Sequence, residues 1–592
     1  MISYYPTRSV QNELGGLRAK ALSTVLYGGN TVERHGPIWG GGFYHYKISF
    51  SQYSSLRQVF IIILFFLMAG MRMDPAGLWG QKKGPDQLKV ILEQAKQARA
   101  SCHWRQAASY FEQALESVEG PSRRQISQQL RWCRAQATVE ERYQDGSICQ
   151  LVRDTKVDQA EALLAEIIEL IDHSYYVTIN PEQCLRESLL HMQAATENAF
   201  LQSQFSIDKG GLEELRREIL TLRGDGGGLE QKSWSDMLKP VEALSELSEK
   251  AGLGAAWVAT ELAYAFCDSL DEYSHMLSPH QYKLLTDQLK GYYVGIGVEL
   301  VYEGDYPTVF DVIAKGPAEE AGIHPGDILI KVGDTDLKGK SAIGVSHRLA
   351  GGQNTRIQVR VRRGDEELEF SMQRELVSSP SVRYTQLLGE EKQIGYVRIA
   401  NFDHDTSLEL RGAIDRLQRA GAVGLLIDIR SNGGGVMNAA IEAVRLFLER
   451  GNIVMVQRGE EKTLYQAGGD MESLKLPMAI LVDKNTASAA EIFAAALKQH
   501  RRAVVIGQKT RGKAVVQTLF PLRNGPAGVC ITTASYLPPD NQSFHNQGIE
   551  PDIIVENSQR EEKNVRSMAI YLGKDDSVLQ KGLDLLQHRR LF

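Results

Sequence analysis

A strand, a helix and a second strand follow one another between residues 478 and 507, and they constrain the fold of the chain more than any other segment. Met478–Val482 is a continuous apolar run, an alanine-rich helix is predicted over Ala489–Lys498, and a second apolar strand covers Ala503–Gly507. Ser488 stands at the corner between the first strand and the helix, where backbone N–H groups are free to face negative charge. A hydroxyl at this corner is suited to act as a nucleophile.

The glycine-bearing turn GQKTRGK follows the second strand and ends in Lys513. A serine hydroxyl needs a base, and a lysine serves as one only where its ammonium is desolvated enough to lose a proton. Apolar residues on both sides of the turn favour such a pocket, Gly512 allows close approach of the backbone, and Gln517 could orient the amine. For an isolated pair, an N-cap serine and a solvated turn lysine would be the commoner interpretation.

The whole block, Asn485–Ile492 followed by Gly507–Lys513 and Gln517, resembles the carboxy-terminal processing (tail-specific) proteases. These are serine peptidases with a Ser-Lys dyad and an embedded PDZ domain. The resemblance implies that Ser488 is the nucleophile, that Lys513 is the base and that Gln517 assists. It also implies a crotonase-like α/β peptidase core.

A second glycine turn, Ser431–Gly435, follows a predicted buried strand. The resemblance implies an oxyanion hole made by the backbone N–H groups of Gly434 and Ala489. On its own, a run of three glycines is more often a tight turn between a strand and a helix. The chain departs from the family pattern at three positions, where the family often has serine, phenylalanine and proline: Ala490, Arg511 and Gly433.

Residues 291–376 are predicted to form a PDZ domain. Its glycine-rich opening would bind a peptide C-terminus through Gly295, Ile296, Gly297 and Val298, because side chains there would block the approach. The peptide would add as a strand beside 298–300, with a side-chain pocket that includes Leu349. Three further motifs in the expected order complete the resemblance: Pro317–Gly322, Pro325–Ile330 and Val332–Asp334.

The N-terminal quarter divides into three predicted segments. Residues 1–56 are interpreted as disordered or as a mis-assigned start. Residues 57–75 contain the apolar run Val59–Gly70 and are interpreted as a signal peptide or membrane anchor, with a buried helix as the alternative. Residues 80–200 are helical, and Ile91–Val118 resembles a tetratricopeptide-type hairpin, although an ordinary helical bundle fits equally well.

The remaining segments complete a multidomain α+β architecture. Residues 201–290 are a helical lead-in with a loop insertion at the GDGGG sequence. A Ser-Lys peptidase core is predicted over 382–556, with the PDZ domain inserted ahead of it. A tail over 557–592 carries a helix at Ser577–His588.

Composition excludes several classes of function. A net charge of −6 argues against nucleic acid as a partner. The six cysteines show no metal-binding spacing, and no cofactor or metal is expected. His500 and His545 are rival bases for a Ser-His arrangement, but neither has an evident acidic partner in the sequence, and His275 is expected to be a structural histidine in a loop.

These observations predict an exported serine endopeptidase, periplasmic or anchored facing the periplasm, that binds unstructured polypeptide C-termini. An adaptor, or self-association through the N-terminal helical region, is a further expected partner. Two alternatives stay open: a catalytically silent scaffold that binds protein tails, and an acyl-transfer enzyme such as an esterase. The complete set of Ser488, Lys513 and Gln517 argues against the scaffold, and the PDZ domain argues against the esterase.

Overall fold

The computed structural model describes residues 2–4, 85–224, 234, 238–302, 304–389, 393–468, 473–540, 542–556 and 576–588. The predictions for residues 57–75, and for nearly all of 1–56, fall outside these ranges. Two compact units divide the chain, residues 6–131 and residues 132–592 together with 1–5. Across the described ranges, none of the helices combines the length and apolar character needed to cross a bilayer.

In the first unit, helices α3 (Pro85–Ala100) and α4 (Trp104–Leu115) pack against each other, and α5 (Gly120–Tyr143) begins. Small side chains allow the close approach, since Ala95, Ala107 and Ala114 are fully buried. The sequence therefore predicted this hairpin correctly as a pair of closely packed helices.

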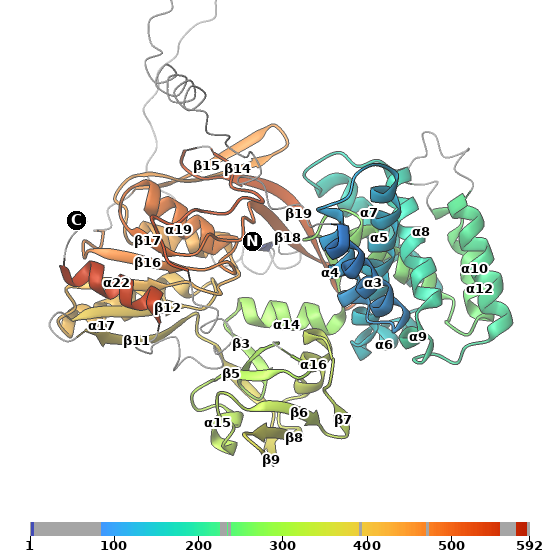
Figure 1. The fold of residues 1–592 in the computed structure, drawn as a ribbon, viewed down its shortest axis with the longest axis horizontal. Coiled ribbons are helices and arrows are strands. Elements are labelled where there is room, and N and C mark those ends of the chain that lie inside the picture. The colour runs from blue at the N-terminus through green and yellow to red at the C-terminus, as the bar shows by residue number, and fades with distance from the viewer. Residues whose placement is uncertain are drawn as a thin grey trace, which may run out of the picture. The chain divides into compact units, whose positions relative to one another are not determined.

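The part of the second unit predicted to be the peptidase core is built on a six-stranded sheet in the order β11-β12-β13-β16-β17-β20 (Figure 1). All neighbouring pairs are parallel except the antiparallel pair of β11 and β12. The strands are β11 (Val382–Leu388), β12 (Ile394–Ile399), β13 (Gly424–Asp428), β16 (Met478–Val482), β17 (Val504–Gly507) and β20 (Ile553–Ile554).

Alternation along the strands gives this sheet two apolar faces. Leu425, Ile427 and Ile480 belong to the cluster on the side of α17, α18 and α19, whereas Leu426 and Leu481 face α22 on the other side. Both faces are covered, which is why these strands are apolar without interruption. The helices are α17 (Thr406–Arg419), α18 (Met437–Arg445), α19 (Ala489–Gln499) and α22 (Ser577–His588).

A second sheet has the strand order β1-β18-β19-β14-β15, and β2 also pairs with β19. Its strands are β1 (Ile2–Tyr4), β2 (His275–Leu277), β14 (Gly451–Arg458), β15 (Glu461–Ala467), β18 (Val515–Pro521) and β19 (Gly528–Leu537). The β14–β15 hairpin was not predicted from the sequence. The strand β1 lies within the stretch interpreted as disordered and pairs in parallel with β18.

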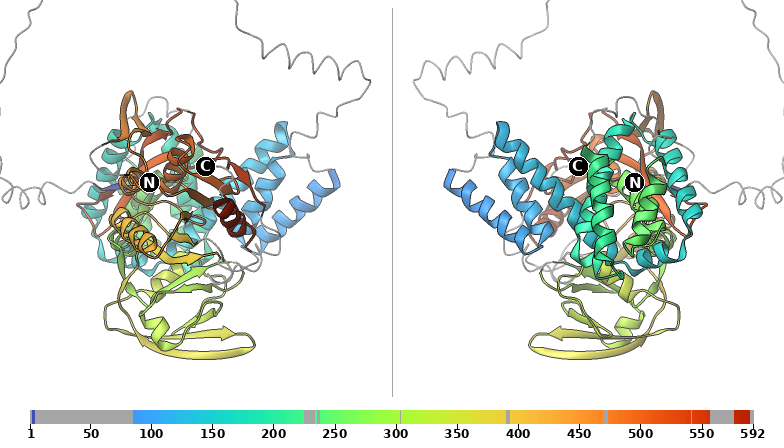
Figure 2. Two further views of the ribbon diagram at one scale, coloured as in Figure 1. Left: turned by 90° about the vertical axis from the view of Figure 1, so that its left-hand side faces the viewer. Right: turned by 90° about the vertical axis from the view of Figure 1, so that its right-hand side faces the viewer.

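Helices between residues 146 and 268 pack together around a common apolar core that also includes Val529 and Ile531 of β19. Helices α10 and α12 lie side by side in this region (Figures 1 and 2). The helices are α6 (Gly146–Asp154), α7 (Val157–Ser174), α8 (Pro181–Glu197), α9 (Ala199–Gln202), α10 (Lys209–Gly224), α12 (Val241–Lys250) and α13 (Ala256–Asp268).

The PDZ-type domain is a separate sheet in the order β4-β5-β6-β8-β9, with β7 paired to β6. The β8–β9 hairpin extends along the bottom of both views in Figure 2. Strands β3 (Tyr292–Gly295) and β10 (Glu375–Ser378) pair where the chain enters and leaves the domain. The other elements are α14 (Pro279–Leu289), β4 (Val298–Val301), β5 (Thr308–Val312), α15 (Pro317–Ala321), β6 (Ile328–Val332), β7 (Thr335–Asp336), α16 (Ala342–Leu349), β8 (Arg356–Arg363) and β9 (Glu366–Gln373).

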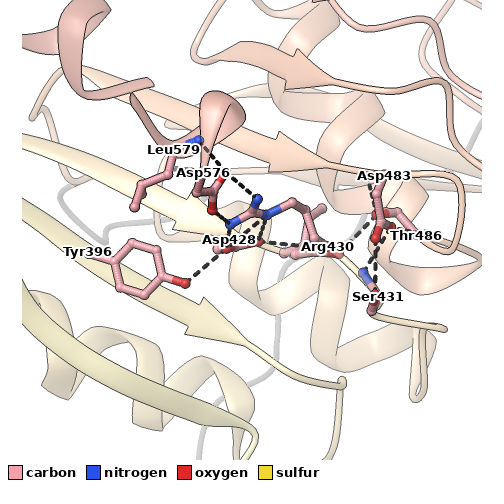
Figure 3. Close-up of polar contacts among 9 residues, drawn as sticks. Tyr396, Asp428, Arg430, Ser431, Asp483, Thr486, Asp576 and Leu579 are labelled. Carbon is pink, nitrogen blue, oxygen red and sulfur yellow. Dashed lines mark hydrogen bonds and ion pairs between the residues drawn. The ribbon is translucent and has the colours of Figure 1, made fainter. Parts of the chain in front are cut away.

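A buried ion network joins α22 to the carboxyl end of β13. Arg430 contacts both Asp428 and Asp576 at 2.7 and 2.8 Å, and Tyr396 donates to Asp428 at 2.9 Å (Figure 3). Burial is the largest single effect and raises the pKa of Asp428, but the charge and hydrogen bonds of Arg430, together with the charge of Arg398, bring the net pKa below its ordinary value. The glycine turn that follows Arg430 is therefore held by a C-terminal helix.

Replacing Asp576 by alanine should weaken this support. Removing one partner of a buried ion pair leaves uncompensated charge, so we expect Asp576→Ala to lower the free energy of unfolding by about 3 kcal/mol. Asp584→Ala, an exposed position on the same helix, is the matched control and should change it by less than about 0.5 kcal/mol. Chemical denaturation with global fitting measures both. Equal stability of the two variants would contradict the proposed support.

Candidate active site

Ser488 lies in a turn that begins at the carboxyl end of β16. Its side chain is fully buried, and its backbone has φ +61°, a conformation that costs a non-glycine residue about 1–3 kcal/mol. The helix α19 begins at the next residue, as the sequence predicted. Strained corners of this kind are kept where the surrounding contacts fix them, and those contacts define the site.

The corner at Ser488 is tied to the glycine turn after β13. Asp483 accepts hydrogen bonds from the Ser431 and Thr486 N–H groups, each at 2.9 Å (Figure 3). The Ala487 N–H donates to the backbone oxygen of Asn432 at 2.9 Å. Two turns at the carboxyl ends of adjacent parallel strands, where α/β proteins bind their ligands, are therefore locked together.

Gly434 packs directly against Ser488. A Cβ atom at this position would lie 2.7 Å from the Cβ of Ser488, and the backbone has φ +105°. No side chain fits there. The glycine turn is thus more than a convenient connection, because it forms one wall of the site.

The N–H groups of Gly434 and Ala489, the two predicted oxyanion donors, differ in whether they already have a hydrogen-bond acceptor. The Gly434 N–H donates to the Asn432 side-chain oxygen at 2.8 Å. The Ala489 N–H has no acceptor among the residues that the structure describes. The Ala489 group is therefore ready to meet a substrate oxygen, whereas Gly434 shares its N–H with Asn432.

Glu491 connects Ser488 to Lys513 through their backbones. One carboxylate oxygen accepts from the N–H groups of Ser488 at 2.8 Å and of Lys513 at 2.9 Å. The other oxygen accepts from the Gly512 N–H at 2.7 Å and from the Thr510 hydroxyl at 2.5 Å. Burial raises the pKa of Glu491, while the four donors oppose that shift.

Tyr536 makes a second connection between the same two residues. Its hydroxyl donates to the backbone oxygen of Lys513 at 2.6 Å and lies 3.1 Å from that of Ser488. The ring is buried on β19. Tyr536 could not be found from the sequence, because it contacts backbone atoms of residues distant in the chain. Glu491 follows Ser488 by three residues, the spacing of a capping box, and that local pattern is the signal that could have found it.

The side-chain nitrogen of Lys513 lies over the ring of Tyr273, 4.6 Å from its centre. Burial lowers the pKa of the Lys513 ammonium below its ordinary value. This environment contradicts the interpretation of Lys513 as a solvated turn residue. It is the environment that a lysine needs if it is to act as a base.

Tyr273 is held by the turn that precedes β2. Asp271 accepts from the N–H groups of Tyr273 and Ser274 at 2.8 and 2.6 Å. The Ser274 hydroxyl in turn accepts from the Thr532 N–H at 3.0 Å. The Gln517 amide donates to the Thr532 hydroxyl at 3.2 Å, so the predicted assisting residue is attached to the same turn.

The rival histidines make backbone contacts instead. His500 contacts the Asn452 oxygen at 2.7 Å, and His275 contacts the Tyr273 oxygen at 3.0 Å. His545 accepts from the Ala514 N–H at 3.3 Å. In the part of the chain that the structure describes, no group of three or more His, Cys, Asp or Glu side chains is arranged to hold a metal ion.

A second candidate site is a groove of about 460 Å³ on the PDZ-type domain. It is lined by the four predicted residues Gly295, Ile296, Gly297 and Val298, and also by Leu349 of α16. The same groove is lined by Leu284 and Gln288 of α14 and by Arg383 of β11. Residues outside the PDZ-type domain therefore contribute to it, which the sequence did not indicate.

Arg383 joins the groove strand to the peptidase sheet. Its guanidinium bonds Glu299 of β4 at 3.0 Å and the Ser379 hydroxyl at 2.8 Å. The pair is only partly buried, so its contribution to stability is modest. Its geometry nevertheless sets the position of β4 relative to β11.

Comparisons with known proteins agree with this architecture. Residues 393–555 match peptidase family S41, and residues 294–373 match the PDZ domain. A carboxyl-terminal-processing protease of Synechocystis is 33% identical over 327 residues, which are 54% of this chain and 74% of the relative. The chain belongs to peptidase family S41, the family of the carboxyl-terminal-processing proteases.

Other relatives share the same segment. A "Probable CtpA-like serine protease" of Staphylococcus aureus is 32% identical over 327 residues, 54% of this chain and 65% of the relative, so the chain spans less than two thirds of its length. The solved photosystem II D1 C-terminal processing protease is 24% identical and has a TM-score of 0.40. The match covers 67% of this chain and 93% of that protein.

Replacing Glu491 by glutamine tests the connection between the two dyad residues. The amide nitrogen would face N–H donors, so at least one charge-assisted hydrogen bond is lost, and we expect the free energy of unfolding to fall by about 2–3 kcal/mol. The rate at which a fluorophosphonate labels Ser488 should fall at least about 10-fold. Glu442→Gln, a change at an exposed carboxylate on α18, is the control and should alter neither quantity. Unchanged labelling in Glu491→Gln would show that Ser488 is activated without this carboxylate.

The pH dependence of labelling tests Lys513. Only the neutral amine accepts a proton, so the rate should rise as pH increases through the Lys513 pKa and fall below it. Because burial lowers that pKa, the midpoint should lie below the ordinary lysine value of about 10.4. A rate profile from pH 5 to 11 measures it. A midpoint at or above the ordinary value would exclude a desolvated amine.

Proposed function

We propose that this protein is a serine endopeptidase that binds unstructured protein C-termini in its PDZ groove and hydrolyses peptide bonds with a Ser488-Lys513 dyad. The observation that carries the proposal is the pair of buried groups, Glu491 and Tyr536, that holds both dyad residues by their backbones. The Lys513 nitrogen lies over the Tyr273 ring and burial lowers its pKa, which supports a role as general base.

In the proposed reaction the Ser488 oxygen attacks the substrate carbonyl, and Lys513 accepts the hydroxyl proton. The same proton passes to the leaving amine as the peptide bond breaks, which leaves an acyl-enzyme on Ser488. Water then attacks the acyl-enzyme, with Lys513 again taking and returning a proton. Gln517 lies on the strand after Lys513 and helps to position the amine.

The negative charge on the tetrahedral oxygen would be met by backbone N–H groups. Ala489 is the first donor, because it precedes the rest of α19 and lacks an acceptor among the described residues. Gly434 is the second donor, and its N–H group would share its hydrogen bond between the Asn432 side-chain oxygen and the substrate oxygen. Losing one such donor typically lowers the rate about 100- to 1,000-fold.

The groove supports recognition of an extended chain end. A peptide would add beside β4, with its terminal carboxylate at the Gly295–Val298 loop and an apolar side chain toward Leu349. Folded proteins keep their termini unavailable for strand addition, so substrates would be restricted to proteins with loose tails.

Further features of the proposal concern location and partners. The apolar run Val59–Gly70 supports export, with the protein periplasmic or anchored facing the periplasm. The α3–α4 hairpin supports a tetratricopeptide-like surface for an adaptor or for self-association. The mixed core of strands and covering helices is compatible with the crotonase-like description that the family resemblance implies.

Cleavage of an unfolded protein ending in an apolar residue tests the proposal. We expect Ser488→Ala to lower the rate more than about 1,000-fold and Lys513→Arg to lower it about 100- to 10,000-fold, since an arginine does not lose its proton. Lys509→Ala, an exposed lysine in the same turn, is the matched control and should cleave normally. Cleavage is followed by gel and mass spectrometry with full-length protein.

The outcomes separate the alternatives. An intact substrate that nevertheless binds to the wild-type protein would favour the scaffold. Hydrolysis of small esters without any cleavage of polypeptide would favour the esterase. Cleavage that survives both dyad substitutions would exclude Ser488 and Lys513 as the catalytic pair.

A further inference from the structure

Strand β18 belongs to the second sheet and runs away from Lys513. It begins two residues after Lys513 and pairs with β19 on one side. On its other side, residues 2–4 of the same chain add as a parallel strand, with Ile2 opposite Gln517 and Tyr4 opposite Leu519. Figure 1 shows the start of the chain beside β18. This edge therefore accepts an extended polypeptide segment in parallel register.

The direction of the added strand has a chemical consequence. A parallel segment that starts opposite Gln517 runs toward Pro521, away from Lys513. In a substrate bound at the same place, each residue nearer to the C-terminus would lie farther from Ser488 and Lys513. The edge of β18 would thus hold the part of the substrate that follows the cleaved bond.

The far end of this edge leads to the PDZ groove through α14. Leu519 belongs to an apolar cluster against which Tyr282, Leu285 and Leu289 of α14 pack. Two other residues of α14, Leu284 and Gln288, line the groove. One helix therefore contacts both the edge strand and the groove where the substrate terminus would be held.

We propose that the β18 edge is the docking strand for the segment of substrate immediately C-terminal to the cleaved bond. The occupant is an extended, unfolded polypeptide that pairs in parallel with residues 515–521. This inference rests on the proposed function. Recognition through backbone groups accepts many side chains, so selectivity would come from the PDZ groove rather than from this strand. Residues 2–4 form only three pairs, and a longer substrate segment displaces them.

Cross-linking tests the docking strand without requiring catalysis. Full-length Ser488→Ala is mixed with a peptide that ends in an apolar residue and carries p-benzoylphenylalanine one or two residues after the bond that the wild-type protein cleaves. After irradiation, mass spectrometry should place the cross-link in residues 515–521. The opposite edge of the same sheet, strand β15, is the internal control and should not be labelled. Cross-links confined to β15 or to β4 would overturn the proposal.

An N-methyl scan of peptide substrates tests the pairing pattern in the wild-type protein. Methylation removes one backbone donor at a time, and alternate residues of a strand face the partner. We expect kcat/KM to fall about 2- to 10-fold at alternate amides after the cleaved bond. Equal effects at all positions, or none, would contradict strand addition.

The two measurements also separate this inference from the proposed function. Cross-links on β18 in a protein that cleaves no peptide would support the docking strand and exclude the peptidase. Normal cleavage with cross-links elsewhere and no effect of methylation would support the peptidase and exclude the docking strand.

Discussion

The carboxylate of Glu491 is the contact on which the arrangement of the site depends. It lies within the first turn of α19, yet it binds the backbone of Ser488 on one side and of Gly512 and Lys513 on the other. A buried carboxylate is costly unless each oxygen is satisfied, and here four donors converge on it. The donors come from segments about twenty residues apart, so the charge stabilises only one placement of the segments that carry Ser488 and Lys513.

A second buried network of charges fixes the glycine turn that follows β13. Arg430 is buried between Asp428 and Asp576, and the residue that follows it, Ser431, is fixed by Asp483. Buried ion pairs contribute little net stability compared with apolar packing, but breaking them is costly. Their effect here is positional, because the glycine turn between them carries Gly434 to within contact of Ser488.

Sequence reasoning predicted the parts of this site that are local in the chain. Apolar runs and helical spacing gave β16, α19, β19 and α22 with nearly correct ends, and the family resemblance pointed to Ser488 and Lys513. Two of the supporting groups, Tyr536 and Tyr273, could not be predicted, because they reach Lys513 only after the second sheet has formed. The β14–β15 hairpin was missed because its strands alternate weakly, with much of β15 exposed.

The groove and the amine are linked by one short stretch of chain. Tyr273, which shields the Lys513 nitrogen, is followed after four residues by Ser278, the N-cap of α14. The Ser278 hydroxyl donates to the buried Asp145, which fixes the start of that helix, and residues of the same helix line the groove. The ring over the Lys513 nitrogen and the helix that lines the groove therefore belong to one continuous segment, residues 273–289. The lowered pKa of Lys513 depends on its burial, because water admitted around the amine would favour the protonated form.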